Sequence, residues 1–291
     1  MEESVHTEEV RKPRLHVALR ILLYLVATLI GIGIFQAVAY MLSGIKVTDF
    51  VDVTPTPLNK MLIEVLSLVP LFIVTFIFRR YLDRKTFISL GFSLKGKGVD
   101  FLFGLLVAVA IYAIGSTVLV ITGNIQFSKP GIGIQTLLLN VVTFTVVAIT
   151  EELMVRGYIL NNLLSSTNKY LALTISSVIF AGMHGLNSGI TVLAMINLFL
   201  AGILLGAVYI FTQNLWYAIS LHFFWNLIEG PVLGYYVSGN ATESFLSAKP
   251  LGNPLLSGGD FGFEGSIVCT ILSAVLALAI IIYNEKKQRK F

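Results

Sequence analysis

Residues 171–228 have the sequence LALTISSVIFAGMHGLNSGITVLAMINLFLAGILLGAVYIFTQNLWYAISLHFFWNLI and contain no Asp, Glu, Lys or Arg. Apolar runs of this length, without the alternation of a half-buried strand, are typical of membrane-spanning helices. A short polar break, Thr212-Gln213-Asn214, divides the stretch. We therefore expect an antiparallel pair of helices on either side of this break.

The composition of the whole chain agrees with a membrane protein. Of its 291 residues, 56% are hydrophobic and 12% are charged, and the mean hydropathy is +0.84. Soluble domains carry about 25% charged residues, which they need to cover their surface. The values exclude a disordered chain and argue against a nucleic-acid binder. The single cysteine, Cys269, excludes an intramolecular disulfide and a cysteine zinc cluster.

A helix needs about 20 apolar residues to cross a bilayer. Eight stretches meet this length and predict an all-α, polytopic membrane protein: residues 15–42, 60–78, 99–122, 133–161, 170–186, 189–212, 214–237 and 264–283. The first run is too long for a signal-peptide core and is expected to be a retained span. We expect one membrane domain over residues 1–291.

The basic residues predict the orientation of this bundle. With eight spans and both termini in the cytoplasm, 15 of the 20 Lys and Arg residues fall on the cytoplasmic side, as the positive-inside rule requires. They are Arg11, Lys12, Arg14, Arg20, Arg79, Arg80, Arg84, Lys85, Lys95, Lys97, Lys169, Lys286, Lys287, Arg289 and Lys290. Lys46, Lys60, Lys129 and Lys249 fall on the other side. The segment 238–263 is expected to be a surface loop, with a lid as one option.

Several polar and ionisable residues interrupt the apolar helices. They are Glu151, Glu152, Arg156, His184, His222, Asn226 and Glu229. A charge at the bilayer centre costs about 2.5–3.5 kcal/mol even on mild scales, so such groups indicate a site. Counting from the expected span ends, three of the helices bring these groups to overlapping depth, nearer the cytoplasm than the far side. Glu229 is expected at the rim of the site or in a structural role.

The spacing of these residues suggests how they pair. Glu152 and Arg156 are four residues apart, so they share a helix face and lower the cost of burying each other. His222 and Asn226 have the same spacing and can converge on one atom. A carboxylate and an imidazole can take a proton from water, and a second imidazole with an amide can donate to an oxyanion. These are the parts of peptide or ester hydrolysis.

Other intramembrane protease designs fit the sequence less well. There is no His-Glu-x-x-His motif, so a zincin-type site is absent. The aspartates fall in or beside the expected loops, which argues against a two-aspartate protease. Ser188 lies in an expected turn and is a poor candidate for a serine nucleophile.

Three motifs resemble those of the CPBP (Abi) family of CAAX-processing and bacteriocin-processing intramembrane proteases. They are Glu151-Glu152-Leu-Met-Val-Arg156, Phe180-Ala-Gly-Met-His184 and His222-Phe-Phe-Trp-Asn226, in this order on successive apolar helices. The motif block covers about residues 140–230. The eight-helix arrangement is also similar to that of type II CAAX prenyl endopeptidases.

The resemblance implies a role for each motif residue. Glu151 would be the general base, and His184 would hold the attacking water. His222 and Asn226 would form the oxyanion hole, and Glu152 would pair with Arg156 to orient the site. The expected enzyme is a metal-free glutamic-type endopeptidase without a cofactor. Zinc held by Glu151, His184 and His222 is the alternative, because the family has also been described as metalloproteases.

Two other classes of function remain open at this stage. A proton- or ion-coupled transporter also uses intramembrane Glu and His, although the chain shows no clear inverted repeat. A scaffold or immunity protein would have lost activity, against which the complete motifs argue. We expect a multi-pass protein, in the plasma membrane if prokaryotic, whose partners are lipids and a peptide or lipidated protein. The sequence leaves open the substrate, whether it is prenylated, and the oligomeric state.

Overall fold

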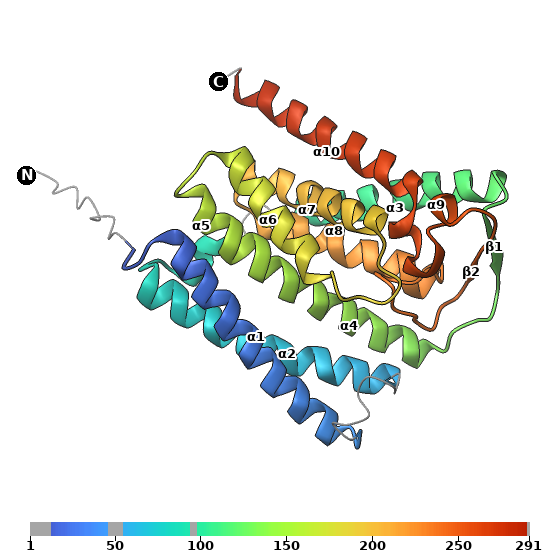
Figure 1. Cartoon of the computed structure of the whole chain (residues 1–291), viewed down its shortest axis with the longest axis horizontal. Coiled ribbons are helices and arrows are strands. Elements are labelled where there is room, and N and C mark those ends of the chain that lie inside the picture. Colours follow the sequence, from blue (N-terminus) through green and yellow to red (C-terminus); the bar gives the residue numbers. More distant parts are fainter. Residues whose placement is uncertain (1–12, 46–54, 94–97, 290–291) are drawn as a thin grey trace, which may run out of the picture.

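The computed structural model describes residues 13–45, 55–93 and 98–289, and Figure 1 shows their arrangement. Six basic residues that entered the orientation argument lie outside these described ranges: Arg11, Lys12, Lys46, Lys95, Lys97 and Lys290.

One helix overlaps each of the eight expected stretches. These helices are α1 (Val17–Leu42), α2 (Pro57–Ile77), α3 (Gly98–Ile121), α4 (Ile134–Glu152), α6 (Lys169–Met183), α7 (Val192–Thr212), α8 (Leu215–Leu227) and α10 (Ile267–Gln288). Within the described ranges, six helical segments are long and apolar enough to cross a membrane, whereas α6 and α8 are shorter. The helical membrane fold is confirmed at this level, and the count of eight crossings stays a prediction.

Three helices continue into π-helical segments that the apolar pattern does not reveal. They are η2 (Phe78–Leu82) after α2, η4 (Leu153–Leu160) after α4 and η5 (Ile228–Val232) after α8. η4 leads into the short α5 (Asn161–Leu164). Isolated π turns inside α-helices are frequent at functional sites. Here two of them directly follow helices that carry the sequence motifs.

The outer faces of the bundle are apolar. On α1, α2 and α10 the side chains of Leu22, Ile30, Phe76 and Val275 are each more than half exposed, and many large hydrophobic neighbours share this exposure. A soluble monomer rarely exposes such continuous apolar surface. Together with the long apolar helices, this makes the protein a multi-pass integral membrane protein.

The helices lie side by side, and the start of α1 and the end of α10 lie at the same end of the bundle (Figure 1). α1 packs against α2, α2 against α4, and α4 against α8. α3 also packs on α8, while α7 lies between α6 and α10. The turn between α7 and α8 is as short as expected, because Gln213 adopts a left-handed conformation with φ of 49°. This confirms the helix pair predicted around the polar break.

The segment 233–266, which we call the cap segment, packs against the end of the bundle away from the termini. Its strand β2 (Ser247–Pro250) pairs antiparallel with β1 (Ile125–Ser128), and it also contains α9 (Pro254–Ser257), η6 (Gly259–Phe261) and η7 (Phe263–Gly265). Phe261 and Phe263 are completely buried. Most of residues 238–260 are exposed or half-buried, as expected for a surface loop, while Phe261 and Phe263 anchor its end in the core.

At the opposite end, buried ion pairs connect α1 with the ends of α2 and α4. Arg20 and Arg79 both pair with Asp83, which follows η2. The Arg79 guanidinium also donates to the Asn161 side chain at 2.9 Å, next to the short 3₁₀ turn η3 (Phe87–Leu90). Two of the residues predicted to mark the cytoplasmic side thus also have a structural role.

Candidate active site

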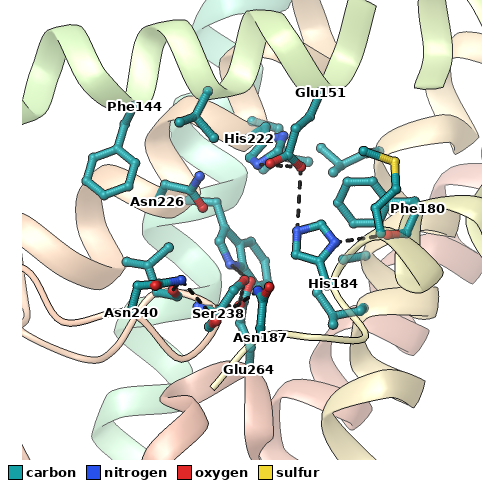
Figure 2. A pocket seen from close by; sticks show the side chains of 18 of the residues that line it. Phe144, Glu151, Phe180, His184, Asn187, His222, Asn226, Ser238, Asn240 and Glu264 are labelled. Atoms are coloured by element: carbon teal, nitrogen blue, oxygen red, sulfur yellow. Dashed lines mark hydrogen bonds and ion pairs between the residues drawn. The ribbon is translucent and has the colours of Figure 1, made fainter. Parts of the chain in front are cut away.

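A cavity of about 300 Å³ lies between α2, α4, α6, α7, α8 and the cap segment. Four of the residues singled out from the sequence line it: Glu151, His184, His222 and Asn226. Figure 2 shows their side chains gathered around this common space. The helices that carry them are separate in the chain, so the fold brings the expected site residues together.

Glu151 and His184 face each other across the cavity. The Nε2 atom of His184 lies 3.6 Å from Oε2 of Glu151, and that oxygen accepts no hydrogen bond in the structure. Nδ1 of His184 lies 2.9 Å from the carbonyl oxygen of Phe180, one turn earlier on α6. A carbonyl oxygen can only accept, so Nδ1 carries a proton. In the neutral ring, Nε2 therefore offers a lone pair towards the carboxylate.

Glu152 holds the His222 ring on the side away from the cavity. Its Nδ1 atom lies 2.9 Å from Oε1 of Glu152, and Nη1 of Arg156 donates to the same oxygen at 2.7 Å. Glu152 and Arg156 are fully buried, so the expected ion pair exists and no water screens it. Because the carboxylate accepts from Nδ1, Nε2 of His222 points into the cavity, 4.0 Å from Oε2 of Glu151. Glu152 thus fixes the orientation of His222 as well as pairing with Arg156.

Close packing of α6 on α7 completes the environment of Arg156. Its Nη2 atom donates to the carbonyl oxygen of Gly202 at 3.2 Å. A Cβ at Gly202 would lie 2.8 Å from Ser177, so this approach of the helices requires glycine. The Phe180 ring lies 4.4 Å from the Arg156 guanidinium carbon, within cation–π range. The phenylalanine of the second motif therefore supports both Arg156 and His184.

Asn226 lies one turn after His222 on the same face of α8 and is buried at the cavity wall. This geometry allows an imidazole and an amide to donate to one oxygen atom. Glu229 is fully buried in η5 but does not line the cavity. It therefore does not lie at the rim of the cavity, and its structural role stays a prediction.

α2 contributes two charged residues to the cavity that the sequence analysis did not select. They are Lys60 and Glu64, one turn apart. Glu64 lies inside the stretch 60–78, so an acidic residue within an expected span was the available signal. Lys60 was placed in a loop on the far side of the membrane, whereas it lies in the first turn of α2, where Thr56 is the N-cap.

The cap segment also reaches the cavity, through Ser238, Asn240 and Glu264. Glu264 accepts hydrogen bonds from Nε1 of Trp225 at 2.9 Å and from the hydroxyl of Ser238 at 2.6 Å. These bonds tie the cap segment to α8, one residue before Asn226. The segment is thus a wall of the candidate site.

The cavity extends from the middle of the helices towards the end of the bundle away from the termini. His184 caps the C-terminal end of α6, and Asn187 in the following turn also lines the cavity. The depth count had placed the polar groups nearer the cytoplasm. It counted Glu151 from residue 161, whereas the helical segment continues to Leu164, and it counted His184 from residue 170, which puts this residue at the far end of α6.

Zinc held by Glu151, His184 and His222 was the alternative to a metal-free site. The Nε2 atoms of His184 and His222 lie 3.6 and 4.0 Å from Oε2 of Glu151, and a carboxylate with two imidazoles is a donor set that zinc accepts. The choice between the metal-free site and zinc stays a prediction.

Comparison with known proteins finds a match in the part of the chain that carries the three motifs. Residues 133–228 match the family model described as Type II CAAX prenyl endopeptidase Rce1-like. A search of curated proteins finds no match. The matched range runs from the start of α4 into η5 and includes all three motifs. The match confirms the resemblance seen in those motifs: over residues 133–228 this multi-pass membrane protein is similar to the type II CAAX prenyl endopeptidase Rce1-like family.

Proposed function

We propose that the protein is an intramembrane endopeptidase that hydrolyses a peptide bond of a membrane-associated substrate with water activated by Glu151 and His184. The substrate is a CAAX-type prenylated tail or a bacterial peptide. The observation that carries the proposal is the pair of acceptor atoms, Oε2 of Glu151 and Nε2 of His184, 3.6 Å apart in a buried cavity. Two acceptors cannot bond each other, but one water can donate to both.

Water held in this way is polarised for attack. As the water oxygen adds to the substrate carbonyl carbon, Glu151 takes one proton of the water. The other O–H keeps its hydrogen bond to His184, and this bond orients the lone pair of the water oxygen towards the carbonyl carbon. Glu151 then delivers its proton to the amine of the departing peptide. The peptide bond breaks, the new carboxyl group contains the water oxygen, and the carboxylate of Glu151 is restored.

The negative charge that develops on the carbonyl oxygen needs donors. Asn226 supplies an amide N–H, and His222 supplies Nε2–H when both its ring nitrogens carry protons. The local charges favour that state. Glu151, Glu152 and Arg156 together leave one net negative charge in a buried region, which a protonated His222 balances. Arg156 donates to the same Glu152 oxygen that accepts from His222, so this pair orients His222 as a donor.

The experiment that tests this function is a cleavage assay with the purified full chain. The two substrates are a farnesylated CAAX peptide and an unmodified apolar peptide, each with and without a zinc chelator. We expect cleavage of at least one of them, unaffected by the chelator. Loss of activity with chelator and its return with zinc would replace the metal-free mechanism by the metalloprotease alternative. Absence of cleavage of both peptides would favour a transporter or a non-catalytic protein.

A further inference from the structure

An apolar groove of about 350 Å³ lies on the outer surface of α2 and shares no lining residue with the cavity of the candidate site. Large apolar side chains of α2 and one ring of η3 line it: Phe72, Ile73, Phe76, Ile77 and Phe87. The four side chains on α2 are each more than a third exposed. In a membrane protein such a groove opens to the lipid.

The turn η3 forms one wall of this groove because it folds back along α2. The Phe87 ring stacks on the Phe72 ring with centroids 5.8 Å apart, and it stacks on Phe92 at 5.4 Å. Nη2 of Arg79 donates to the Ser89 hydroxyl at 2.7 Å and so holds the turn in place. The groove therefore has a fixed shape that does not depend on a mobile side chain.

The groove lies just inside the end of a membrane span. The apolar helical segment that contains α2 ends at Leu82, five to ten residues after the groove residues of α2. At 1.5 Å per residue this is a depth of about 8–15 Å, within one half of a hydrocarbon core about 30 Å thick. Tyr81, which is exposed next to Leu82, is a residue type enriched at the membrane–water interface. An acyl chain in the groove would thus have its headgroup at this end of α2.

Two arginines lie where that headgroup would be. Arg80 follows Phe72 and Phe76 at intervals of four residues, so it continues the groove face of the helix. Arg84 follows in the turn after η2, and both side chains are exposed. In the part of the chain that the structure describes, neither side chain makes a hydrogen bond or an ion pair.

The neighbouring carboxylate is not available to these arginines. Asp83 is fully buried, where it pairs with Arg20 and Arg79 and accepts a hydrogen bond from Nδ2 of Asn162 at 3.1 Å. Guanidinium groups at headgroup level match the phosphate of a lipid, and they favour a lipid with net negative charge.

We propose that the groove binds one anionic phospholipid, with an acyl chain between α2 and Phe87 and the phosphate at Arg80 and Arg84. The site lies outside the candidate active site and does not depend on the proposed function. In the orientation that the basic residues predict, it faces the cytoplasmic leaflet, which carries anionic lipids. The bound chain would press Phe87 against α2 and stabilise this end of the bundle.

The test measures lipid binding to the detergent-purified full chain by native mass spectrometry, together with the unfolding temperature. It compares phosphatidylglycerol with phosphatidylcholine of identical acyl chains, and glycerol phosphate supplies the headgroup charge without a chain. We expect phosphatidylglycerol to bind at least about tenfold more tightly than phosphatidylcholine, because two arginines attract its net charge, and to raise the unfolding temperature more. Glycerol phosphate should do neither.

Charge variants identify the headgroup site. The double variant Arg80→Gln with Arg84→Gln should bind both lipids equally. The matched control is Lys286→Gln with Lys287→Gln, which removes two exposed charges of α10 at the same end of the bundle and should keep the wild-type preference.

A groove variant tests the chain site. Ile73→Trp narrows the groove but keeps both arginines, and it should weaken the binding of phosphatidylglycerol. Leu29→Trp, at an exposed position of α1 outside the groove, should not.

Equal binding of the two lipids by the wild-type chain would overturn the proposal, and this result needs no variant. A preference that persists in the double arginine variant, or that the double lysine control loses to the same extent, would also overturn it. Unchanged binding in Ile73→Trp would exclude the groove. Glycerol phosphate that binds as tightly as phosphatidylglycerol would indicate a site for free phosphate in place of a lipid.

Discussion

Glu152 and Arg156 are both fully buried, and each stabilises the charge of the other. Removing one partner leaves an uncompensated charge without water, which costs about 3–5 kcal/mol. We therefore expect Arg156→Met to lower the unfolding temperature of the detergent-purified chain clearly. The double variant Glu152→Gln with Arg156→Met should recover part of this loss, because neither charge of the pair remains. Wild-type stability of the single variant would contradict the assignment of this pair.

The same carboxylate holds Nδ1 of His222. Glu152→Gln keeps the shape of the side chain but removes the charge that favours a doubly protonated His222. We expect kcat for the farnesylated CAAX peptide to fall by about 10²–10³-fold, which is the usual effect of removing one hydrogen-bond donor to the oxyanion. KM should change little, since Glu152 does not line the cavity. A change confined to KM would indicate instead that Glu152 affects substrate binding.

At the scale of elements, the contact of α6 with α7 positions Arg156. A Cβ at Gly202 would overlap Ser177, so Gly202→Ala must push the two helices apart or shift the carbonyl that accepts from Arg156. We expect a lower unfolding temperature and at least about tenfold lower activity. The matched control is Gly33→Ala on α1, where nothing lies within 4 Å of the added carbon. Equal effects of both substitutions would rule out this packing argument.

The apolar runs of the sequence were sufficient to predict where the long helices form. Each run was long and continuous, and the break at Gln213 permitted only a short turn between α7 and α8. The motif residues could also be predicted to meet, because charges inside spans need partners. Their chemical roles and the absence of a metal stay predictions.

Other features depend on contacts between distant segments. The π segments η4 and η5 directly continue α4 and α8, and nothing in the apolar pattern distinguishes their residues from those of the α-helices. The cap segment is rich in Gly, Pro and Ser, as a surface loop is, and its anchoring depends on a distant contact, that of the Phe263 ring with Tyr112 on α3. Lys60 was missed because it lies at the very edge of an expected span, and its contact with Phe144 joins two helices.

At the scale of the whole molecule, the position of the cavity relates the orientation of the protein in the membrane to the side from which a substrate enters. The cavity extends towards the end of the bundle away from the chain termini. If both termini are cytoplasmic, as the basic residues predict, that end faces the opposite side of the membrane. A prenylated cytosolic tail would then have to enter from within the bilayer, whereas the inverse orientation would open the cavity to the cytosol.

Labelling of single cysteines in cells decides between these orientations. The native Cys269 is buried and should not react. Ser188→Cys lies at the cavity end and Ser166→Cys between α5 and α6 at the other, and both positions are exposed. With a membrane-impermeant maleimide we expect intact cells to label Ser188→Cys, and Ser166→Cys to react only after permeabilisation. The reverse pattern would show that the predicted orientation is wrong.

The central claim is that Glu151 activates the water that cleaves the peptide. The most direct measurement is kcat for a farnesylated CAAX peptide with Glu151→Gln, which keeps the size of the side chain but cannot accept the proton. We predict that kcat falls by about 10²–10⁴-fold, which is the usual contribution of a general base to the rate, and that the unfolding temperature does not change. Glu243→Gln, an exposed change outside the cavity, should retain wild-type activity. If Glu151→Gln cleaves the peptide as fast as the wild-type chain does, Glu151 is not the base and the account is contradicted.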